Sequence, residues 1–253
     1  MDESENKASK SRQIIRWSKL KQPDIKLLKC LICQYQNELS TFKMIKANDI
    51  FNCGEIIRYQ CPECDVIFGD LRVLLMDSDE LGKDYQDTYS YMQEGDVFNN
   101  ILNALFHFDY LMNKEWTYLD YACGHNRVIK HLQAEGYQIV GYDKFVPVVD
   151  GMIHSLESKK FDVIFSNNFI EHLTNPIEEI KEIITHLNPN GLLVFISDVI
   201  DEYTVEYTHF HTFFYLNRSF PLLCRKLNLA LINSKNFGNY KMRVLKLIEA
   251  DEI

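Results

Sequence analysis

The chain has 253 residues and a net charge of −9, with 46% hydrophobic and 25% charged residues. These values are typical of a globular protein with room for one α/β domain and a small appendage. The negative charge argues against a general nucleic-acid binder, because phosphate contacts need a basic surface. No apolar stretch has the length of a membrane span, and no signal-peptide core is found, so we expect a cytoplasmic protein.

Residues 1–29 form a basic leader with eight Lys or Arg residues and four acidic residues. Such a run predicts a solvated, partly mobile segment, with a docking helix as the alternative.

Five of the seven cysteines fall within 35 residues, namely Cys30, Cys33, Cys53, Cys61 and Cys64. Four of them form two Cys-x-x-Cys pairs with 27 residues between the pairs. Each pair can place two thiolates on one ion, and four thiolates with no open position suit structural zinc. Paired disulfides are disfavoured in a reducing compartment, and the fifth, Cys53, suits a buried small residue. We therefore expect a zinc ribbon over residues 30–70, with Cys30, Cys33, Cys61 and Cys64 as ligands.

An aromatic-rich linker is expected over residues 71–96, and an α/β domain over residues 97–253. Helical spacing of apolar residues predicts a helix over 97–114. Further helices are expected at about 126–136, 176–187 and 217–227. Strands are expected at about 117–121, 138–142, 161–166, 191–197, 229–236 and 242–249.

The most informative stretch is Tyr118–Arg127, where an apolar run ends at Asp120 and a small-residue turn leads into a helical pattern. The next apolar run stops at Asp143. Strand, tight turn, helix, strand and terminal acid describe a βαβ unit that holds a nucleoside, with the acid on the ribose hydroxyls. A dinucleotide site would need Gly-x-Gly-x-x-Gly, and this turn has the single glycine Gly124.

Only 17 residues separate Asp143 from Phe161. A helix and a third strand do not both fit there at full length. We expect that both are shortened or that one is absent, with Gly151–Leu156 as a remnant of the strand.

The turn resembles motif I of the class I S-adenosylmethionine-dependent methyltransferases, which reads roughly Leu-Asp-x-Gly-Cys-Gly-x-Gly. Phe161–Leu173 is similar to the fourth strand of that family with its Glu-His-Leu element. Leu187–Ile196 is similar to its Leu-Lys-Pro-Gly-Gly turn and fifth strand. The resemblance covers about residues 97–249, and it implies a Rossmann-like sheet with helices on both faces and S-adenosylmethionine as the cofactor.

Two positions of the motif differ from the family pattern. Ala122 replaces the first glycine, which is tolerable if its φ stays negative. Asn126 replaces the last, and asparagine accepts a left-handed conformation readily.

The resemblance also implies roles for individual residues. Asp120 would anchor the turn or receive the methionine ammonium, and backbone groups of Ala122 and Gly124 would flank the methionyl and ribose portions. Asp143 would bind the ribose diol, and Asn167 would lie along the cofactor. For Asp143 the alternative is a solvated acid at a strand end.

Methyl transfer to a hydroxyl benefits from a general base, and histidine suits neutral pH. Two sites are candidates: His172 in the Glu-His-Leu element, and the pair His209 and His211 in an aromatic-rich loop. Of the pair, His211 is the better base, because Phe210 and Phe213 flank it as expected pocket walls. His172 has a competing role as a helix cap that orients a neighbour.

Some O-methyltransferases and small-RNA 3′-end methyltransferases bind a divalent ion through Glu-x-x-Glu-His. Here Asn168 stands at the first Glu position, which leaves Glu171 and His172, with His209 or His211 as further ligands. A lost carboxylate weakens a magnesium site.

The ribbon ahead of the catalytic domain resembles that of glycan-modifying methyltransferases. We therefore expect O-methylation of a glycan or nucleotide-linked sugar. A complete deoxysugar C-methyltransferase is disfavoured, because that type carries a large further C-terminal domain. The alternatives are an RNA or small-molecule methyltransferase and an inactive zinc-stabilised binding module. The ribbon itself would be a folding staple, with or without contact to the acceptor.

Overall fold

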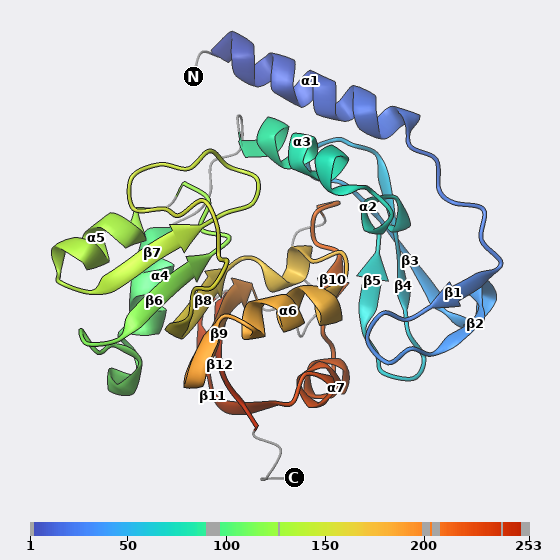
Figure 1. The fold of residues 1–253 in the computed structure, drawn as a ribbon. Coiled ribbons are helices and arrows are strands. Elements are labelled where there is room, and N and C mark those ends of the chain that lie inside the picture. The colour runs from blue at the N-terminus through green and yellow to red at the C-terminus, as the bar shows by residue number, and fades with distance from the viewer. Residues whose placement is uncertain are drawn as a thin grey trace. The chain divides into compact units, whose positions relative to one another are not determined.

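The computed structural model describes residues 3–89, 97–125, 127–198, 203, 208–238 and 240–248. The chain divides into two compact units. Unit 1 comprises residues 1–94, 171–176 and 200–223, and unit 2 comprises residues 95–170, 177–199 and 224–253. Each unit is therefore assembled from segments that are far apart in the sequence (Figure 1).

Unit 2 contains a six-stranded sheet in the order β11-β12-β9-β8-β6-β7. Its strands are β6 (Thr117–Tyr121), β7 (Gln138–Tyr142), β8 (Phe161–Asn167), β9 (Leu187–Asp198), β11 (Leu229–Phe237) and β12 (Tyr240–Leu247). β6 pairs in parallel with both β7 and β8, and β8 pairs in parallel with β9. β12 is antiparallel to both of its neighbours. All six strands lie where the apolar runs predicted them.

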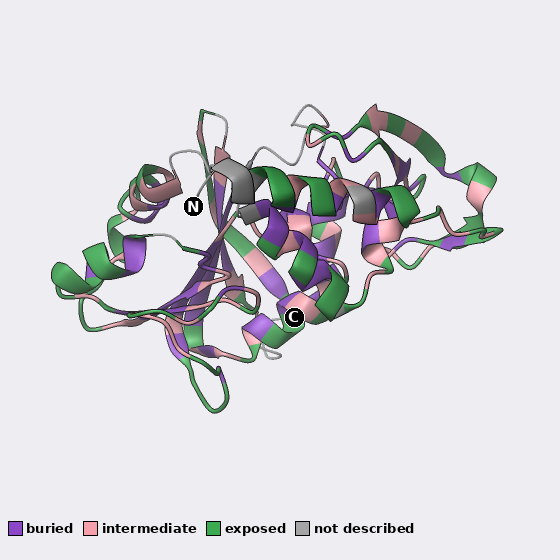
Figure 2. Cartoon of the chain, turned by 90° about the horizontal axis from the view of Figure 1, so that it is seen from above, coloured by how far each residue is buried: buried purple, intermediate pink, exposed green. Residues whose placement is uncertain are grey.

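Helices cover both faces of this sheet. α4 (Val97–Leu105) and α5 (Val128–Ala134) contribute Ile101, Leu105 and Ile129 to a core that includes Val163 and Val194 of the strands. α6 (Pro176–Ile184), with buried Ile180 and Ile183, lies on the other face (Figure 1). Buried residues run along the strands, as a fully covered parallel sheet requires (Figure 2). The expected Rossmann-like architecture is confirmed.

The helices match the sequence pattern, with ends set by local chemistry. α5 ends before Gly136, whose φ of +90° suits the left-handed position after a helix. α6 begins at Pro176, where a missing N–H costs nothing. The predicted helix over 97–114 is α4 followed by a short 3₁₀ turn, Asp109–Leu111. α7 (Ser219–Lys226) completes the set.

The third strand is reduced to one bridge. Met152 pairs in parallel with Gly141 of β7. Gly141 donates its N–H to Gly151 O at 3.0 Å, and its carbonyl accepts from Ile153 N at 2.9 Å. The expected remnant at Gly151–Leu156 is therefore confirmed, and no named strand lies beyond β7 in the described part of this sheet.

Unit 1 contains a four-stranded antiparallel sheet in the order β10-β5-β4-β3 and a two-stranded sheet. The first comprises β3 (Lys43–Asn48), β4 (Glu55–Gln60), β5 (Ile67–Gly69) and β10 (Phe213–Phe214). The second comprises β1 (Leu27–Lys29) and β2 (Gln36–Glu38), and a 3₁₀ turn (Leu39–Thr41) follows it. We call the four-stranded sheet β10-β5-β4-β3 the ribbon sheet. Its strand β10 comes from residues more than 140 positions away from β5, so a distant segment completes the sheet.

The basic leader forms a helix, α1 (Glu3–Lys19), which favours the docking alternative over a solvated segment. Trp17 is 1% exposed, and Arg16 forms ion pairs with Asp84 and Asp87 of α3 (Ser78–Tyr89). α2 (Leu71–Leu74) precedes α3, so helices occupy most of the segment for which an aromatic-rich linker was expected. In the described part of the chain, no helix is long and apolar enough to cross a membrane.

Candidate functional site

The turn after β6 and the acid after β7 meet in unit 2. The backbone N–H of Gly124 donates to Asp143 Oδ2 at 3.0 Å. Asp143 Oδ1 accepts from the backbone N–H groups of Phe145 and Val146, at 2.8 and 3.1 Å. One carboxylate therefore fixes the turn and the loop after β7 together. This occurs at the carboxyl ends of parallel strands where the chain order reverses, the usual ligand position in such sheets.

The turn carries backbone strain at the position where the family has glycine. Ala122 has a φ of +57°, and Gly124 has a φ of +54°. The condition under which alanine would be tolerated at this position, a negative φ, is not met, since the tight turn requires the left-handed region at this residue. An L-residue pays roughly 1–2 kcal/mol there. Asn126 lies outside the described residues.

Two other residues predicted to contact the cofactor lie at the carboxyl ends of the neighbouring strands. Asp120 is 1% exposed at the carboxyl end of β6, and Asn167 is the last residue of β8. Beside them Tyr121 packs against Tyr142 and Phe169, with ring centroids 5.7 and 5.2 Å apart. The structure thus brings the predicted strand ends together and adds an aromatic cluster that the motif did not indicate.

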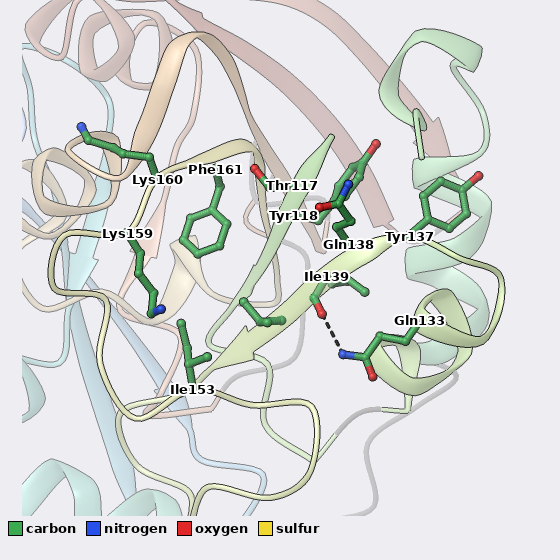
Figure 3. Close-up of a pocket in the computed structure, with 11 residues that line it drawn as sticks. Thr117, Tyr118, Gln133, Tyr137, Gln138, Ile139, Ile153, Lys159, Lys160 and Phe161 are labelled. Atoms are coloured by element: carbon green, nitrogen blue, oxygen red, sulfur yellow. Dashed lines mark hydrogen bonds between the residues drawn. The ribbon is translucent and has the colours of Figure 1, made fainter. Parts of the chain in front are cut away.

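A second hollow of unit 2, of about 410 Å³, lies at the opposite end of the strands. Its lining includes Thr117, Gln138 and Phe161, the first residues of β6, β7 and β8 (Figure 3). Gln133 donates to Ile139 O at 2.8 Å beside it, and so covers part of the β7 edge. This hollow is separate from the crevice at Gly124 and Asp143.

The predicted acceptor-side histidines lie together in unit 1. The rings of His172 and His211 are 4.8 Å apart between centroids, and His172 Nδ1 lies 3.1 Å from Phe210 O. Candidate ligand atoms of Glu171, His172 and His211 all lie within 4.8 Å of one another. Burial lowers the pKa of His172 to about 4, and burial together with the nearby Arg58 guanidinium lowers the pKa of His211 well below its usual range. Both imidazoles are therefore neutral at pH 7.

The expected walls of the His211 site are different in the structure. Phe213 stacks on Phe68 and Tyr215, because it belongs to β10 of the ribbon sheet. Phe210 stacks on Tyr85 of α3, at a centroid distance of 4.7 Å. Phe214 is the aromatic ring beside His211, at 6.4 Å. His172 contacts a loop carbonyl, which supports its orienting role rather than a capping one.

His209, the other loop histidine, is fully buried between two carboxylates. Its Nδ1 lies 2.6 Å from Asp49 Oδ2, and its Nε2 lies 2.9 Å from Asp84 Oδ2. Burial alone would lower the pKa of His209, but these hydrogen bonds outweigh it and raise the pKa to about 10. His209 is therefore an imidazolium with both nitrogens engaged, and it does not join the cluster of His211. Asp49 and Asp84 stand in no motif, so sequence reasoning did not find them.

The four cysteines of the predicted metal site converge in unit 1. Cys30 Sγ lies 3.6 Å from Cys64 Sγ, and Cys33 Sγ lies 3.5 Å from Cys61 Sγ. Zinc–sulfur bonds of about 2.3 Å in a tetrahedron require sulfur separations of roughly 3.8 Å. The set therefore fits zinc. Cys53 is buried beside Asp49 and His209, away from this set, as expected of a spare cysteine.

Comparisons with known proteins identify the fold. A family model described as a methyltransferase domain matches residues 91–232, more than half of the chain. No curated protein matches the chain by sequence.

Several solved structures are similar to this chain. One is a 1,6-didemethyltoxoflavin-N1-methyltransferase from Burkholderia thailandensis, solved with S-adenosylhomocysteine, at 13% identity and a TM-score of 0.53 over 77% of this chain and 96% of that one. The CcbJ methyltransferase from Streptomyces caelestis is 13% identical, with a TM-score of 0.48 over 64% and 96%. A methyltransferase from Leishmania major is 17% identical, with a TM-score of 0.45 over 59% and 73%. Fold, motif order and family model together lead to one conclusion: the chain belongs to the methyltransferase domain family and has the class I S-adenosylmethionine-dependent fold.

Proposed function

We propose that the protein transfers a methyl group from S-adenosylmethionine to an oxygen of a glycan or nucleotide-linked sugar. The observation that carries the cofactor part is the bond between Gly124 N and Asp143 Oδ2 at the carboxyl ends of β6 and β7. A carboxylate at that position can accept hydrogen bonds from the two ribose hydroxyls. Asp120 and Asn167 would line the remaining crevice, and the Tyr121, Tyr142 and Phe169 rings offer apolar contact to the cofactor.

S-adenosylmethionine supplies a sulfonium that is already an excellent leaving group, so the protein needs to align the acceptor and remove its proton. His211 is the candidate base, because its imidazole is neutral and its Nδ1 is buried without a hydrogen-bond partner in the described structure. His172 would orient it, since the two rings touch edge to face. Neutral imidazole is the form that accepts a proton from a hydroxyl.

Support for the acceptor class is the aromatic content of unit 1. Tyr85 packs edge to face on His172 and Phe214 on His211, and aromatic faces suit sugar rings. Several fold neighbours are named as small-molecule methyltransferases, including a mitomycin 7-O-methyltransferase, which keeps a small-molecule acceptor as the alternative.

The acceptor test is incubation of the protein and labelled S-adenosylmethionine with separate panels of nucleotide sugars, polysaccharides, small aromatic metabolites and small RNA. Transfer of label to the nucleotide sugars or polysaccharides supports the proposal. Label confined to another panel would assign the acceptor to that class instead. His211→Ala should lower the rate by about 100-fold or more, the usual contribution of a general base. Normal turnover by His211→Ala would remove that residue from the role.

The competing use of the same cluster is to hold a divalent ion. The candidate ligand atoms of Glu171, His172 and His211 all lie within 4.8 Å of one another, which favours this use. One carboxylate and two neutral imidazoles suit a transition metal better than magnesium. Elemental analysis distinguishes the two uses. Zinc at one equivalent per chain and no second ion favours the base, whereas a second metal lost in His172→Ala favours the ion.

We also propose that Cys30, Cys33, Cys61 and Cys64 hold a structural zinc ion, on the strength of their sulfur separations. A ribbon with such short strands buries too little apolar surface to fold alone, so the ion would stabilise it.

A further inference from the structure

A buried arginine of the ribbon sheet, Arg58, binds the loop that carries His209 and His211. Arg58 lies in the middle of β4 and is 0% exposed. Its Nε and Nη2 donate to the carbonyl oxygen of His211 at 3.1 and 2.8 Å. Nη2 also donates to the carbonyl oxygen of Thr208 at 2.6 Å. One guanidinium therefore binds both ends of the loop Thr208–His211, which we call the histidine loop.

The guanidinium is also held in place from its other side. Its Nη1 donates to the Tyr203 hydroxyl at 3.2 Å. Its carbon lies 5.1 Å from the centre of the Phe214 ring and 5.9 Å from that of Tyr203. A planar guanidinium can bind two carbonyls and stack on rings at once, and a lysine ammonium cannot. The residue type is therefore matched to this geometry.

Other backbone groups in and next to the histidine loop also have partners in unit 1. His209 N donates to Asp49 Oδ2 at 2.8 Å, and Thr212 N donates to Glu171 O at 2.7 Å. Phe210 O contacts His172 Nδ1, as described above. The loop is thus fixed on both sides of His211, and Arg58 is the partner that binds the His211 backbone itself.

We propose that Arg58 is a positioning residue for His211: by binding the carbonyl oxygens of Thr208 and His211, it holds the His211 imidazole in its place beside His172. Arg58 acts through backbone contacts and takes no part in the methyl transfer. The inference rests on the acceptor-side role proposed for His211. It assigns the ribbon sheet a role beyond that of a folding staple, because β4 carries this residue.

Arg58→Lys tests the proposal, since it keeps the charge and the length but cannot bind two carbonyls in one plane. Arg58→Ala is less useful, because it empties a fully buried position and endangers the fold. Arg243→Lys is the matched control. Arg243 is 3% exposed, bonds Ser197 Oγ, and belongs to unit 2.

Two readouts that need no acceptor are measured on the full chain. Hydrogen exchange of the amides of Thr208–Thr212 should speed up about tenfold or more in Arg58→Lys, because the loop loses hydrogen bonds to a charged group. The ¹⁵N side-chain signal of His211, assigned by its loss in His211→Ala, should shift in Arg58→Lys and stay in place in Arg243→Lys. Unchanged exchange and an unchanged signal in Arg58→Lys would overturn the proposal, as would equal changes in both variants.

Binding of S-adenosylhomocysteine, measured by calorimetry on the same samples, distinguishes failure of the proposed function from failure of the role proposed for Arg58. It should be the same in the parent protein and in Arg58→Lys. If the parent does not bind, the proposed function fails, while the exchange and ¹⁵N results still decide the role of Arg58. Once an acceptor is known, the Arg58→Lys effect on kcat should vanish in a His211→Ala background; full additivity would contradict action through His211.

Discussion

Gly124 and Asp143 are joined by a 3.0 Å hydrogen bond from the backbone of the first to the carboxylate of the second. The same carboxylate also accepts from Phe145 and Val146. Asp143 is therefore both the proposed ribose ligand and the residue that holds the shape of the crevice.

Replacement of Asp143 should weaken cofactor binding for both reasons. We expect Asp143→Ala to lower the affinity for S-adenosylhomocysteine by about 30-fold or more, since charge-assisted bonds of this kind contribute roughly 1.5–3 kcal/mol each. The affinity of Asp143→Asn should lie between those of the parent protein and Asp143→Ala, because one oxygen remains as an acceptor. Calorimetry measures both. Asp150→Ala removes an exposed acid on the same loop, paired with Lys130 at the surface, and should bind like the parent.

The left-handed Ala122 predicts a stabilising substitution. Ala122→Gly should raise the free energy of unfolding by about 0.5–1 kcal/mol, because relief of strain of roughly 1–2 kcal/mol exceeds the added chain entropy of glycine. Ala122→Val should destabilise the protein, since branching at Cβ makes the same φ costlier. Urea unfolding followed by circular dichroism measures the change. A lower midpoint for Ala122→Gly would contradict the strain at this turn.

Gly141 should tolerate no side chain. A Cβ there would collide with the end of the Ile129 side chain and lie 2.8 Å from Cys123 Sγ, so both side chains would have to shift within a packed core. We expect Gly141→Ala to cost about 1–3 kcal/mol of stability, the usual effect of overpacking. Ile129→Ala in the same chain should recover part of that loss. Thermal unfolding measures the stability of both single variants and the double variant. If the losses of Gly141→Ala and Ile129→Ala simply add in the double variant, Ile129 is not the obstacle.

The proposed zinc site predicts the metal content. About one zinc per chain should be found by elemental analysis, and Cys33→Ser or Cys61→Ser should remove most of it. Cys53→Ser is the control, because Cys53 lies beside His209 outside the four-cysteine set, and it should retain the zinc. Equal loss in all three variants would contradict the assignment of ligands.

His209 predicts a pH dependence of stability. Its pKa is raised to about 10 in the folded protein, against an ordinary value near 6.5. Its contribution is therefore complete below about pH 6.5 and is lost as pH rises through 10, with a slope of up to about 1.4 kcal/mol per pH unit. Asp49 and Asp84, whose pKa values are lowered, act at the other end of the pH range: their contribution is present above their ordinary pKa and is lost as pH falls through the lowered values.

His209→Gln isolates this effect. It should cost about 3–5 kcal/mol near neutral pH, because it leaves the buried Asp49 carboxylate without its hydrogen-bonded cation and leaves Asp84 with Arg16. Thermal unfolding between pH 6.5 and 10 should then show a smaller decline in the variant than in the parent. Parallel curves would mean that His209 is not charged in the folded state.

Much of unit 2 was predictable, because its signals are local. The apolar runs around Asp120 and Asp143 mark strands, and the short interval before Phe161 foretold the reduced third strand. The positive φ at Ala122 was not foreseen, since φ depends on how the turn closes against Asp143. Asn126 and its role stay a prediction.

Unit 1 was harder to predict, because its contacts join distant residues. The Cys-x-x-Cys spacing identified the ribbon, but nothing in the sequence indicated that β10 completes its sheet. The partners of His209 lie 125 and 160 positions away, and Arg58 binds residues about 150 positions distant. Such pairs carry no local pattern, so the acceptor-side geometry emerges only once the chain is folded.

The most direct test of the account is a crystal structure of the protein grown with S-adenosylhomocysteine. We predict density in the crevice beside Gly124, with both ribose hydroxyls within about 3 Å of Asp143. No ligand density beside Gly124 in crystals grown with saturating S-adenosylhomocysteine, or a ligand bound only elsewhere, would contradict the proposal that this is a methyl-donor site.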